Sequence, residues 1–416
     1  MTSQPQIQEG RSKDDFRPRS AGLAGFSLRR MLRLVERGRA TIILPSGATI
    51  DHVGARPGPR AELRLHRWRA LPRLALEGDI GFALSYVDGD WSTPDLAALI
   101  QLAAVNNKRR FKALMGLAPF RLFFWLAHKA RSNTRAGSRR NIKAHYDLGN
   151  NFYRLWLDDN MIYSSALYET PQATLEEAQE RKLQCIVERL RLRQSDSVLE
   201  LGCGWGALAA RVAAAGARVT AVTLSPAQLE RARAIAREQR LETRLDFRLE
   251  DYRDVDGCFD RIVSIEMIEA VGREYLPKYF DLIRRSLKPG GFCVLQAITI
   301  AEERFANYCR RPDFIQRYIF PGGFLPTKTL LRETLERAGL RLASIESFGD
   351  SYALTLREWR RRFADAWPEI EKLGFPASFR RLWEYYLCYC EAGFRSGFID
   401  VGLYVVVPAE ARKIEM

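Results

Sequence analysis

Histidine is scarce in this sequence, and its cysteines form no metal-binding pattern. Four histidines are spread along 416 residues, and the seven cysteines are scattered without a C-x-x-C pair. Zinc sites need closely spaced histidine and cysteine ligands, so the sequence predicts no metal site. An odd number of cysteines in a protein of this size indicates reduced thiols, which favours a cytoplasmic location.

Long apolar runs are also absent. No stretch approaches the roughly 20 uninterrupted apolar residues that cross a bilayer, and the first residues contain no apolar signal segment. We therefore expect a protein that does not span a membrane. Apolar residues still make up 47% of the sequence, enough for a packed core. Only residues 1–20 are expected to form a flexible tail.

Acidic residues are missing between Asp95 and Asp147, where basic residues are frequent. The net charge of +15 favours an anionic partner, although it also fits a general richness in arginine. Inside the basic block, Ala113–Ala130 is apolar and aromatic. It suits a helix on an anionic membrane surface, or a buried helix followed by a solvated linker. Nucleic acid is disfavoured, because the aromatic residues cluster instead of alternating with basic ones.

The sequence divides into two parts with different patterns. Residues 21–135 mix short strand-like and helical runs, which predicts a small α+β domain associated with lipid or membrane. A polar stretch, Ala130–Asn141, is the expected linker. Residues 136–416 alternate helices and strands, the pattern of a doubly wound, Rossmann-like α/β domain. Its expected strands are Ser197–Leu201, Arg218–Thr223, Arg244–Leu249, Arg261–Ile265, Phe292–Ile298 and a late one in FIDVGLYVVVP, with a helix at Pro226–Arg240.

The first of these strands runs into the glycine-rich turn ELGCGWG, which contains Glu200, Gly202 and Gly204. Glycines at a strand-to-helix turn let a ligand approach the backbone closely. The G-x-G-x-x-G spacing of a pyrophosphate site is absent, and an acid precedes the glycines. S-adenosylmethionine has no phosphate and carries a cationic amino-acid end that a carboxylate such as Glu200 can bind. The motif therefore predicts an S-adenosylmethionine site, with a plain glycine-rich turn as the alternative.

Two later strand ends supply further candidates for this cofactor. After the second strand, Thr223 or Gln228 can bind the ribose by neutral hydrogen bonds. After the third, Asp251 can hold the adenine amine and Tyr252 can pack on the ring. A surface aspartate and a half-buried tyrosine are the plainer interpretations of the last two.

Several motifs in a fixed order resemble the cyclopropane-fatty-acyl-phospholipid synthase family. They are HYDLGNNFYRLWLD, MIYSSALY, LELGCGWG, VTLSPAQ, EDYRD, EMIEAVG and FIQRYIFPGGFLP. The resemblance runs from His145 to the C-terminus, and a weaker similarity at Glu77–Trp91 extends it into the N-terminal domain. It implies an S-adenosylmethionine-dependent methyltransferase, in which Tyr163 and Ser164 cap the methionine end of the cofactor and Leu224 and Ile265 also line its site.

The resemblance further implies a reaction and a base. The family adds a methylene across the cis double bond of phospholipid acyl chains through a carbocation. A bound bicarbonate is thought to deprotonate that cation. The groups that would hold the bicarbonate map to Glu269, Gln296, Tyr352 and the backbone of Ile298. Glu269 and the bicarbonate would share a proton, so the pair should have a raised pKa. Glu266 is interpreted as a helix-start acid or part of the cofactor pocket, and Tyr352 without the resemblance as a core tyrosine.

Departures from the family pattern keep other outcomes open. Ser165, Ala270 and Gln296 stand where members often carry cysteine, histidine and histidine. If proton removal is redirected, the same cation yields a methyl-branched or methylene product, so a C-methyltransferase that acts on acyl chains is the second hypothesis. A non-catalytic lipid-binding homologue is the third. We expect a peripheral protein at the inner face of the membrane, and a homodimer is a further expectation.

Overall fold

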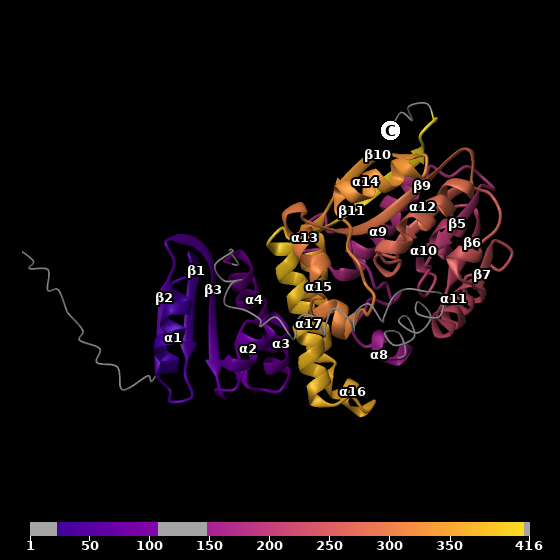
Figure 1. Ribbon diagram of the computed structural model, residues 1–416. Coiled ribbons are helices and arrows are strands. Elements are labelled where there is room, and N and C mark those ends of the chain that lie inside the picture. The colour runs from indigo at the N-terminus through magenta and orange to yellow at the C-terminus, as the bar shows by residue number, and fades with distance from the viewer. Residues whose placement is uncertain (1–22, 107–147, 412–416) are drawn as a thin grey trace, which may run out of the picture.

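The computed structural model describes residues 23–106 and 148–411 of the protein. Within these ranges lie a smaller N-terminal domain and a larger C-terminal α/β domain (Figure 1). The apolar segment Ala113–Ala130, the expected linker Ala130–Asn141 and the tail at residues 1–20 fall outside the described residues. The expectations about them stay predictions.

The N-terminal domain is an α+β unit built on a four-stranded sheet in the order β2-β1-β3-β4. Strand β1 runs antiparallel to β2 and parallel to β3, and β4 is antiparallel to β3. Every second residue of β1 is buried, so one face of the sheet packs into a core with α1 and α4. The elements are α1 (Leu23–Leu32), β1 (Arg37–Ile43), β2 (Thr49–Val53), β3 (Arg56–Leu65), α2 (Ala70–Glu77), α3 (Asp79–Val87), β4 (Trp91–Ser92) and α4 (Leu96–Val105).

The C-terminal domain is a doubly wound, Rossmann-like α/β domain around a seven-stranded sheet. The strand order is β10-β11-β9-β8-β5-β6-β7. Strands β5 to β9 run parallel to one another, whereas β11 lies antiparallel between β9 and β10. The strands are β5 (Ser197–Leu201), β6 (Arg218–Thr223), β7 (Leu245–Leu249), β8 (Phe259–Ile265), β9 (Leu287–Ile300), β10 (Leu340–Ser347) and β11 (Ile399–Pro408).

Helices cover both faces of this sheet because the strands are apolar on both sides. In β5, Val198 belongs to the core beneath α9 and α10, and its neighbour Leu199 belongs to the core beneath α12 and α14. The helices are α8 (Asn150–Arg154), α9 (Leu175–Leu190), α10 (Ala207–Ala214), α11 (Pro226–Glu238), α12 (Leu276–Arg285), α13 (Glu302–Arg310), α14 (Lys328–Arg337), α15 (Gly349–Asp365), α16 (Trp367–Lys372) and α17 (Ala377–Arg395), with short turns η1 (Tyr252–Asp254), η2 (Ile268–Ala270), η3 (Arg273–Tyr275) and η4 (Ile315–Ile319).

The expected strands agree with the structure at their centres and differ at their ends. Strands β5 and β6 have the predicted bounds, and α11 begins at Pro226 because the Ser225 hydroxyl accepts a hydrogen bond from the Gln228 amide at 3.3 Å. Strand β9 is longer than expected. Strand β10 was not predicted, since this edge strand is mostly half-buried and lacks a clear apolar run.

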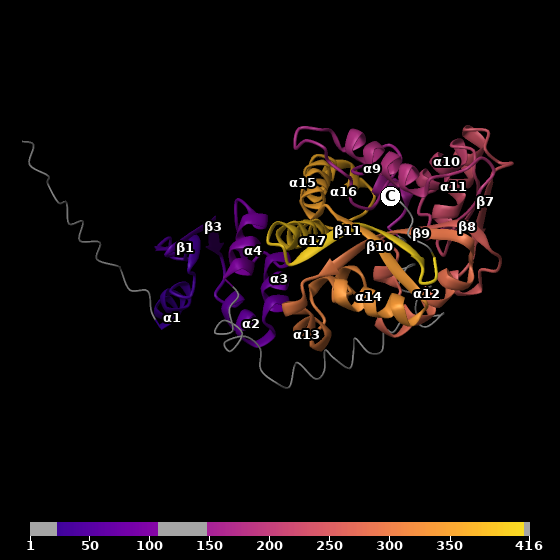
Figure 2. The same cartoon turned by 90° about the horizontal axis from the view of Figure 1, so that it is seen from above.

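Helix α17 lies between the two domains (Figures 1 and 2). It packs against α3 and α4 on one side and against α15 on the other. The Tyr86 hydroxyl of α3 donates to the Glu384 carboxylate at 2.8 Å, and Arg381 donates to the Tyr86 carbonyl at 3.0 Å. The domains therefore share a packed, hydrogen-bonded contact. Among the helices of the described residues, none is long and apolar enough to cross a membrane.

Candidate active site

A cavity of about 180 Å³ opens at the carboxyl ends of β5, β6 and β8. The strand order reverses beside β5, and doubly wound sheets bind ligands at such a point. All of the predicted cofactor residues except Asp251 line this cavity. They are Tyr163, Ser164, Glu200, Gly202, Gly204, Thr223, Leu224, Gln228, Tyr252 and Ile265.

The glycine-rich turn lines this cavity. Its first glycine, Gly202, cannot be replaced by a larger residue without a steric clash. Gly202 has a φ of +78°, and a Cβ atom there would lie 2.7 Å from Cγ of Met267. The amides of Gly202 and Cys203 both donate to the Val222 carbonyl, at 3.0 and 3.1 Å. These bonds join the turn to the end of β6 and hold it beside the cavity.

Glu200 is buried and only partly satisfied. Its side chain lines the cavity, and Oε2 has no hydrogen-bond partner among the described residues. Burial raises the pKa of Glu200 to about 8, and the nearby charge of Lys182 opposes that rise. A buried, unpaired carboxylate oxygen at a cavity wall suits a cationic ligand group. The site thus fits the amino-acid end of S-adenosylmethionine.

Lys182 is a site residue that the sequence analysis missed. It is 1% exposed, lines the same cavity and donates to the Ser164 hydroxyl at 2.8 Å. Burial lowers the pKa of Lys182 to about 8, although Glu266, Asp158 and Glu200 favour its charged form. A signal was available, because Lys182 falls between Ala178 and Ile186 on the apolar face of α9.

The other cofactor candidates differ in how freely they face the cavity. The Thr223 hydroxyl donates to Oε1 of Gln228 at 2.8 Å, so the expected ribose-binding pair is already joined. Asp251 does not line the cavity. Its carboxylate accepts hydrogen bonds from the Arg253 guanidinium at 2.8 and 2.6 Å and from the Arg253 amide at 3.1 Å. The carboxylate expected to hold the adenine amine is therefore engaged by its neighbour, whereas Glu250 lines the cavity.

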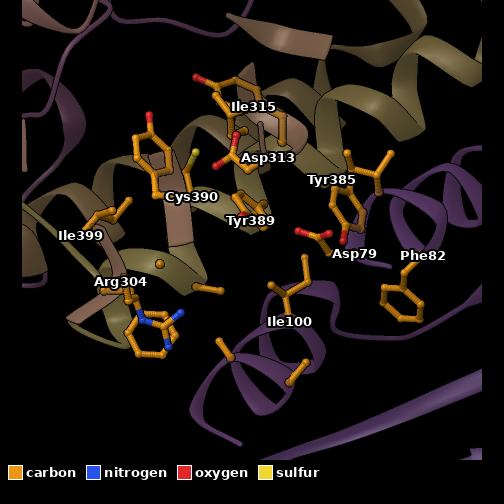
Figure 3. Close-up of a pocket in the computed structure, with 18 of the residues that line it drawn as sticks. Asp79, Phe82, Ile100, Arg304, Asp313, Ile315, Tyr385, Tyr389, Cys390 and Ile399 are labelled. Atoms are coloured by element: carbon orange, nitrogen blue, oxygen red, sulfur yellow. The ribbon is translucent and has the colours of Figure 1, made fainter. Parts of the chain in front are cut away.

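A second, mainly apolar cavity of about 650 Å³ adjoins the first. It extends from Met31 and Ile42 in the core of the N-terminal domain to Glu269 and Tyr352 at the carboxyl end of the large sheet. In Figure 3, Phe82 and Ile100 face it from the N-terminal domain, and Arg304, Tyr389 and Ile399 face it from the C-terminal domain. One continuous cavity therefore spans both domains.

The two cavities meet at three residues. Tyr163, Glu266 and Ala270 line both of them. The Tyr163 ring lies 5.2 Å from the ring of Trp359 and 6.5 Å from that of Phe320, measured between centroids. The Tyr163 hydroxyl is 2.8 Å from the Tyr386 hydroxyl. A group passing between the cavities thus crosses a junction with one carboxylate and several aromatic faces.

Glu266 is the centre of the hydrogen-bond network at this junction. Its Oε1 accepts from the Ser165 amide at 2.8 Å and from Nε2 of Gln296 at 2.7 Å, and its Oε2 accepts from the Tyr352 hydroxyl at 2.6 Å. Burial raises the pKa of Glu266, but these donors and the charge of Lys182 oppose the rise. The resemblance had grouped Gln296 and Tyr352 with Glu269 as the side chains that hold a bound bicarbonate. In the structure both bind Glu266 instead.

Glu269 lines the larger cavity only and has fewer hydrogen-bond partners than Glu266. Its Oε1 accepts from the Ile298 amide at 2.6 Å, a backbone group that the resemblance had placed with Glu269 around a bound bicarbonate. Its Oε2 is buried with no partner among the described residues. Burial and the negative charge of Glu266 raise the pKa of Glu269 to about 8. The resemblance had predicted a raised pKa for a pair formed by Glu269 and bicarbonate, whereas here the neighbouring charge is that of Glu266.

The fold and this cofactor cavity define a class of enzyme, the S-adenosylmethionine-dependent methyltransferases. The mycolic acid cyclopropane synthetase family matches residues 133–403. The protein belongs to this family. It is thus a methyltransferase dependent on S-adenosylmethionine, as the motifs predicted.

Two relatives with established names are similar in sequence to this protein over most of its length. Tuberculostearic acid methyltransferase UfaA1 of Mycobacterium tuberculosis is 40% identical over 363 residues, covering 84% of each protein. Cyclopropane-fatty-acyl-phospholipid synthase of Escherichia coli is 34% identical over 83% of this protein and 87% of that one. The crystal structure of mycolic acid cyclopropane synthase CmaA1 with SAH and CTAB gives a TM-score of 0.61 at 31% identity, covering 64% of this protein and 97% of the other.

Proposed function

We propose that this enzyme transfers a one-carbon unit from S-adenosylmethionine to the cis double bond of an unsaturated acyl chain in a membrane phospholipid. The observation that carries the proposal is the meeting of the two cavities at Tyr163, Glu266 and Ala270. An apolar cavity of about 650 Å³ suits an acyl chain. Its relatives are named for lipid cyclopropane formation and for fatty-acid methylation, so both chemistries are represented among them.

The cofactor supplies an electrophilic methyl group when bound. The residues that would hold it are Glu200 at its cationic end, the backbone at Gly202 and Gly204, and Tyr252 beside the adenine ring. Tyr163 and Ser164 line the same cavity, and Tyr163 also lines the larger one. An isolated alkene is a weak nucleophile, so the enzyme must align it with that methyl and exclude water.

The aromatic residues at the junction have a role in this proposal. Methyl transfer to one alkene carbon leaves a positive charge on the other. The faces of Tyr163 and Phe320 line the lipid cavity near that point, and an aromatic face stabilises a nearby cation by about 0.5–2 kcal/mol. The faces of these rings thus favour the charged intermediate.

The N-terminal domain is part of the lipid site in this proposal. Residues of its core, including Ile42 and Leu63, line the same cavity as Glu269 and Tyr352. An acyl tail with its double bond at the junction could extend among them. The anionic membrane surface stays a prediction because the basic segment lies outside the described residues. The inner-face location and the homodimer also stay predictions.

Bicarbonate does not fit the site as the resemblance predicted. It would need the donors at Gln296 and Tyr352, but both donate to the Glu266 carboxylate at 2.7 and 2.6 Å. The proposed reaction therefore has no step through a bound bicarbonate. Glu269, with its backbone partner at Ile298, is proposed to line the reacting centre as a neutral acid.

Cyclopropane formation is the first product to test, and a methylene or methyl branch is the second. Purified enzyme would be incubated with vesicles of a monounsaturated phospholipid and methyl-trideuterated S-adenosylmethionine. We expect one added carbon that keeps two of the three deuterons, since one is lost as the proton. Proton NMR then separates the ring from its methylene isomer.

Two results would contradict the proposal. Cofactor binding without any modification of the acyl group would reject the reaction, and a failure to bind S-adenosylmethionine would favour a non-catalytic homologue. A methylene product with two deuterons, or a methyl-branched product that keeps all three because the proton is lost from the chain, would reject ring formation alone.

A further inference from the structure

We infer that the carboxylate of Glu266 is itself the proton acceptor of this reaction and takes the place of a bound anion. The inference rests on the function proposed above, because it assigns the base for that carbocation. Three observations carry it: the donors that Glu266 uses, its position between the cavities, and its backbone conformation.

The donors around Glu266 form a complete anion site that is filled by a side chain. A backbone amide at Ser165, an amide at Gln296 and a hydroxyl at Tyr352 all converge on one carboxylate. They come from segments 101, 30 and 86 residues away in the sequence. Three donated bonds favour the charged form of Glu266. About one acceptor site remains on Oε2, since a carboxylate has roughly four.

The position of Glu266 matches the demand of the reaction. The proton to be removed belongs to the newly transferred methyl group, which must lie between the cofactor cavity and the acyl group. Glu266 lines both cavities, whereas Glu269 lines only the lipid one. A base at the junction can reach that methyl, and a base inside the lipid cavity is farther from the cofactor.

The backbone at Glu266 is held in a conformation that glutamate rarely adopts. Its φ is +48°, directly after β8, and its amide donates to the Gln296 carbonyl at 2.9 Å. A left-handed backbone conformation at a non-glycine residue costs energy, and residues with this conformation are frequent at functional sites. A glycine would relieve this strain. The presence of glutamate here therefore indicates a role for its side chain.

Glu269 complements this base instead of competing with it. Two carboxylates in one buried site do not both ionise readily. Glu266 receives three hydrogen bonds and Glu269 receives one, from the Ile298 amide. The charge therefore resides on Glu266 and the proton on Glu269. Because Glu269 is neutral, only one charged carboxylate lies next to the acyl group.

The proton-removal step balances without any further reagent. The alkene π electrons form the bond to the methyl carbon, and the sulfur keeps the electron pair of its broken bond. The other alkene carbon becomes the cation. Glu266 then takes one proton from the new methyl group, and the released C–H electron pair closes the three-membered ring or, after a hydride shift, forms the methylene double bond. The carboxylate becomes a carboxylic acid, which returns its proton to solvent before the next turnover.

The test compares isosteric variants in buffer depleted of carbon dioxide. Glu266→Gln keeps the shape and removes the base, and we expect product formation to fall by at least 100-fold while cofactor affinity changes less than threefold. The matched variant Glu269→Gln replaces an acid that is already neutral, and its loss should be at least tenfold smaller. Added bicarbonate should leave the wild-type rate unchanged.

A further variant restores the predicted anion site. Glu266→Gly fits the positive φ and frees the donors at Ser165, Gln296 and Tyr352. It should be inactive in depleted buffer and regain activity with bicarbonate but not with chloride. Such rescue identifies the side chain as the substitute for an anion. It also shows that the variant is folded.

Opposite results separate this inference from the proposed function. A wild-type rate that depends on bicarbonate, or a Glu266→Gln variant with more than a tenth of wild-type activity, would overturn the role of Glu266 and leave the function intact. Wild-type enzyme that binds cofactor but modifies no phospholipid would overturn the function itself.

Discussion

The Tyr352 hydroxyl donates a 2.6 Å hydrogen bond to the Glu266 carboxylate across 86 residues of sequence. Tyr352 lies in the first turn of α15, whereas Glu266 lies just beyond β8. Burial, and secondly the charge of Glu266, raise the pKa of Tyr352 well above its ordinary value. The tyrosine therefore stays protonated and acts as a donor. This contact links α15, which lines the larger cavity, to the end of β8 beside the smaller cavity.

Cofactor binding should release protons near neutral pH. Burial raises the pKa of Glu200 to about 8, so it is mostly protonated at pH 7 in the free enzyme. A bound cation favours the carboxylate, so affinity should rise between pH 6 and pH 8. Lys182, whose pKa is lowered to about 8, faces the same cavity and adds to the release if it becomes neutral. Calorimetry in two buffers of different ionisation enthalpy measures the number of protons.

Glu200→Gln should bind S-adenosylmethionine roughly 10-fold or more weakly, since a hydrogen bond to a charged group contributes about 1.5–3 kcal/mol. Its proton release on binding should also be smaller than that of the wild type. Unchanged affinity together with unchanged release would remove Glu200 from the cofactor site.

Gly202→Ala should destabilise the enzyme more than Gly204→Ala. Both glycines have positive φ, +78° and +53°, so both substitutions strain the backbone. Only at Gly202 would the new methyl meet Met267, at 2.7 Å, whereas no atom lies within 4 Å at Gly204. We expect an additional loss of about 1–3 kcal/mol for Gly202→Ala from this overpacking. Urea unfolding of both variants measures it, and equal stabilities would contradict the steric argument.

Stability of the free enzyme should fall as the pH rises from about 4.5 to about 8. The pKa of Glu269 is about 8 in the folded protein, against an ordinary value of 4.5. The folded state therefore keeps a proton that the unfolded state has released. Its contribution is complete below pH 4.5 and disappears as the pH passes 8. Glu200 acts in the same direction.

Glu269→Gln stays neutral at every pH and should flatten this dependence. Each retained proton corresponds to at most about 1.4 kcal/mol per pH unit. Chemical unfolding of the wild type and of the variant, each at pH 5, 6, 7 and 8, gives the two slopes of unfolding free energy against pH. A variant with the wild-type slope would show that Glu269 does not carry the proton.

A bulky side chain in the N-terminal part of the lipid cavity should change the preference for acyl length. Ile100 of α4 lines the cavity and faces it in Figure 3. Ile100→Trp would shorten the space beyond the junction, so activity on long acyl groups should fall relative to short ones, by roughly tenfold in kcat/KM. Competition between phospholipids of two acyl lengths measures the ratio.

The matched control is Leu373→Trp, because Leu373 is 46% exposed and lies outside the residues that line the cavity. It should leave the ratio unchanged. An unaltered ratio in a folded Ile100→Trp enzyme would place the acyl group elsewhere.

The alternation of strands and helices in the sequence predicted the class of fold, and the glycine-rich turn ELGCGWG predicted a cofactor site at the end of the first strand. The family was inferred from the resemblance of the ordered motifs, which a single sequence displays directly. Glu200, Gly202 and Gly204 therefore fell in the cavity as expected. Asp251 did not, because its pairing with Arg253 depends on side-chain conformation that spacing does not specify. The edge strand β10 was missed for want of a buried face.

Which of two carboxylates forms the centre of the network depends on the assembled fold. Glu266 and Glu269 are three residues apart and follow the same strand, so the sequence offers each the same partners. The left-handed turn at Glu266, with φ of +48°, directs its carboxylate to Ser165, Gln296 and Tyr352. Glu269 is left with the Ile298 amide. Hydrogen bonds among segments far apart in the sequence determine protonation, and such contacts exist only once the sheet and α15 are assembled.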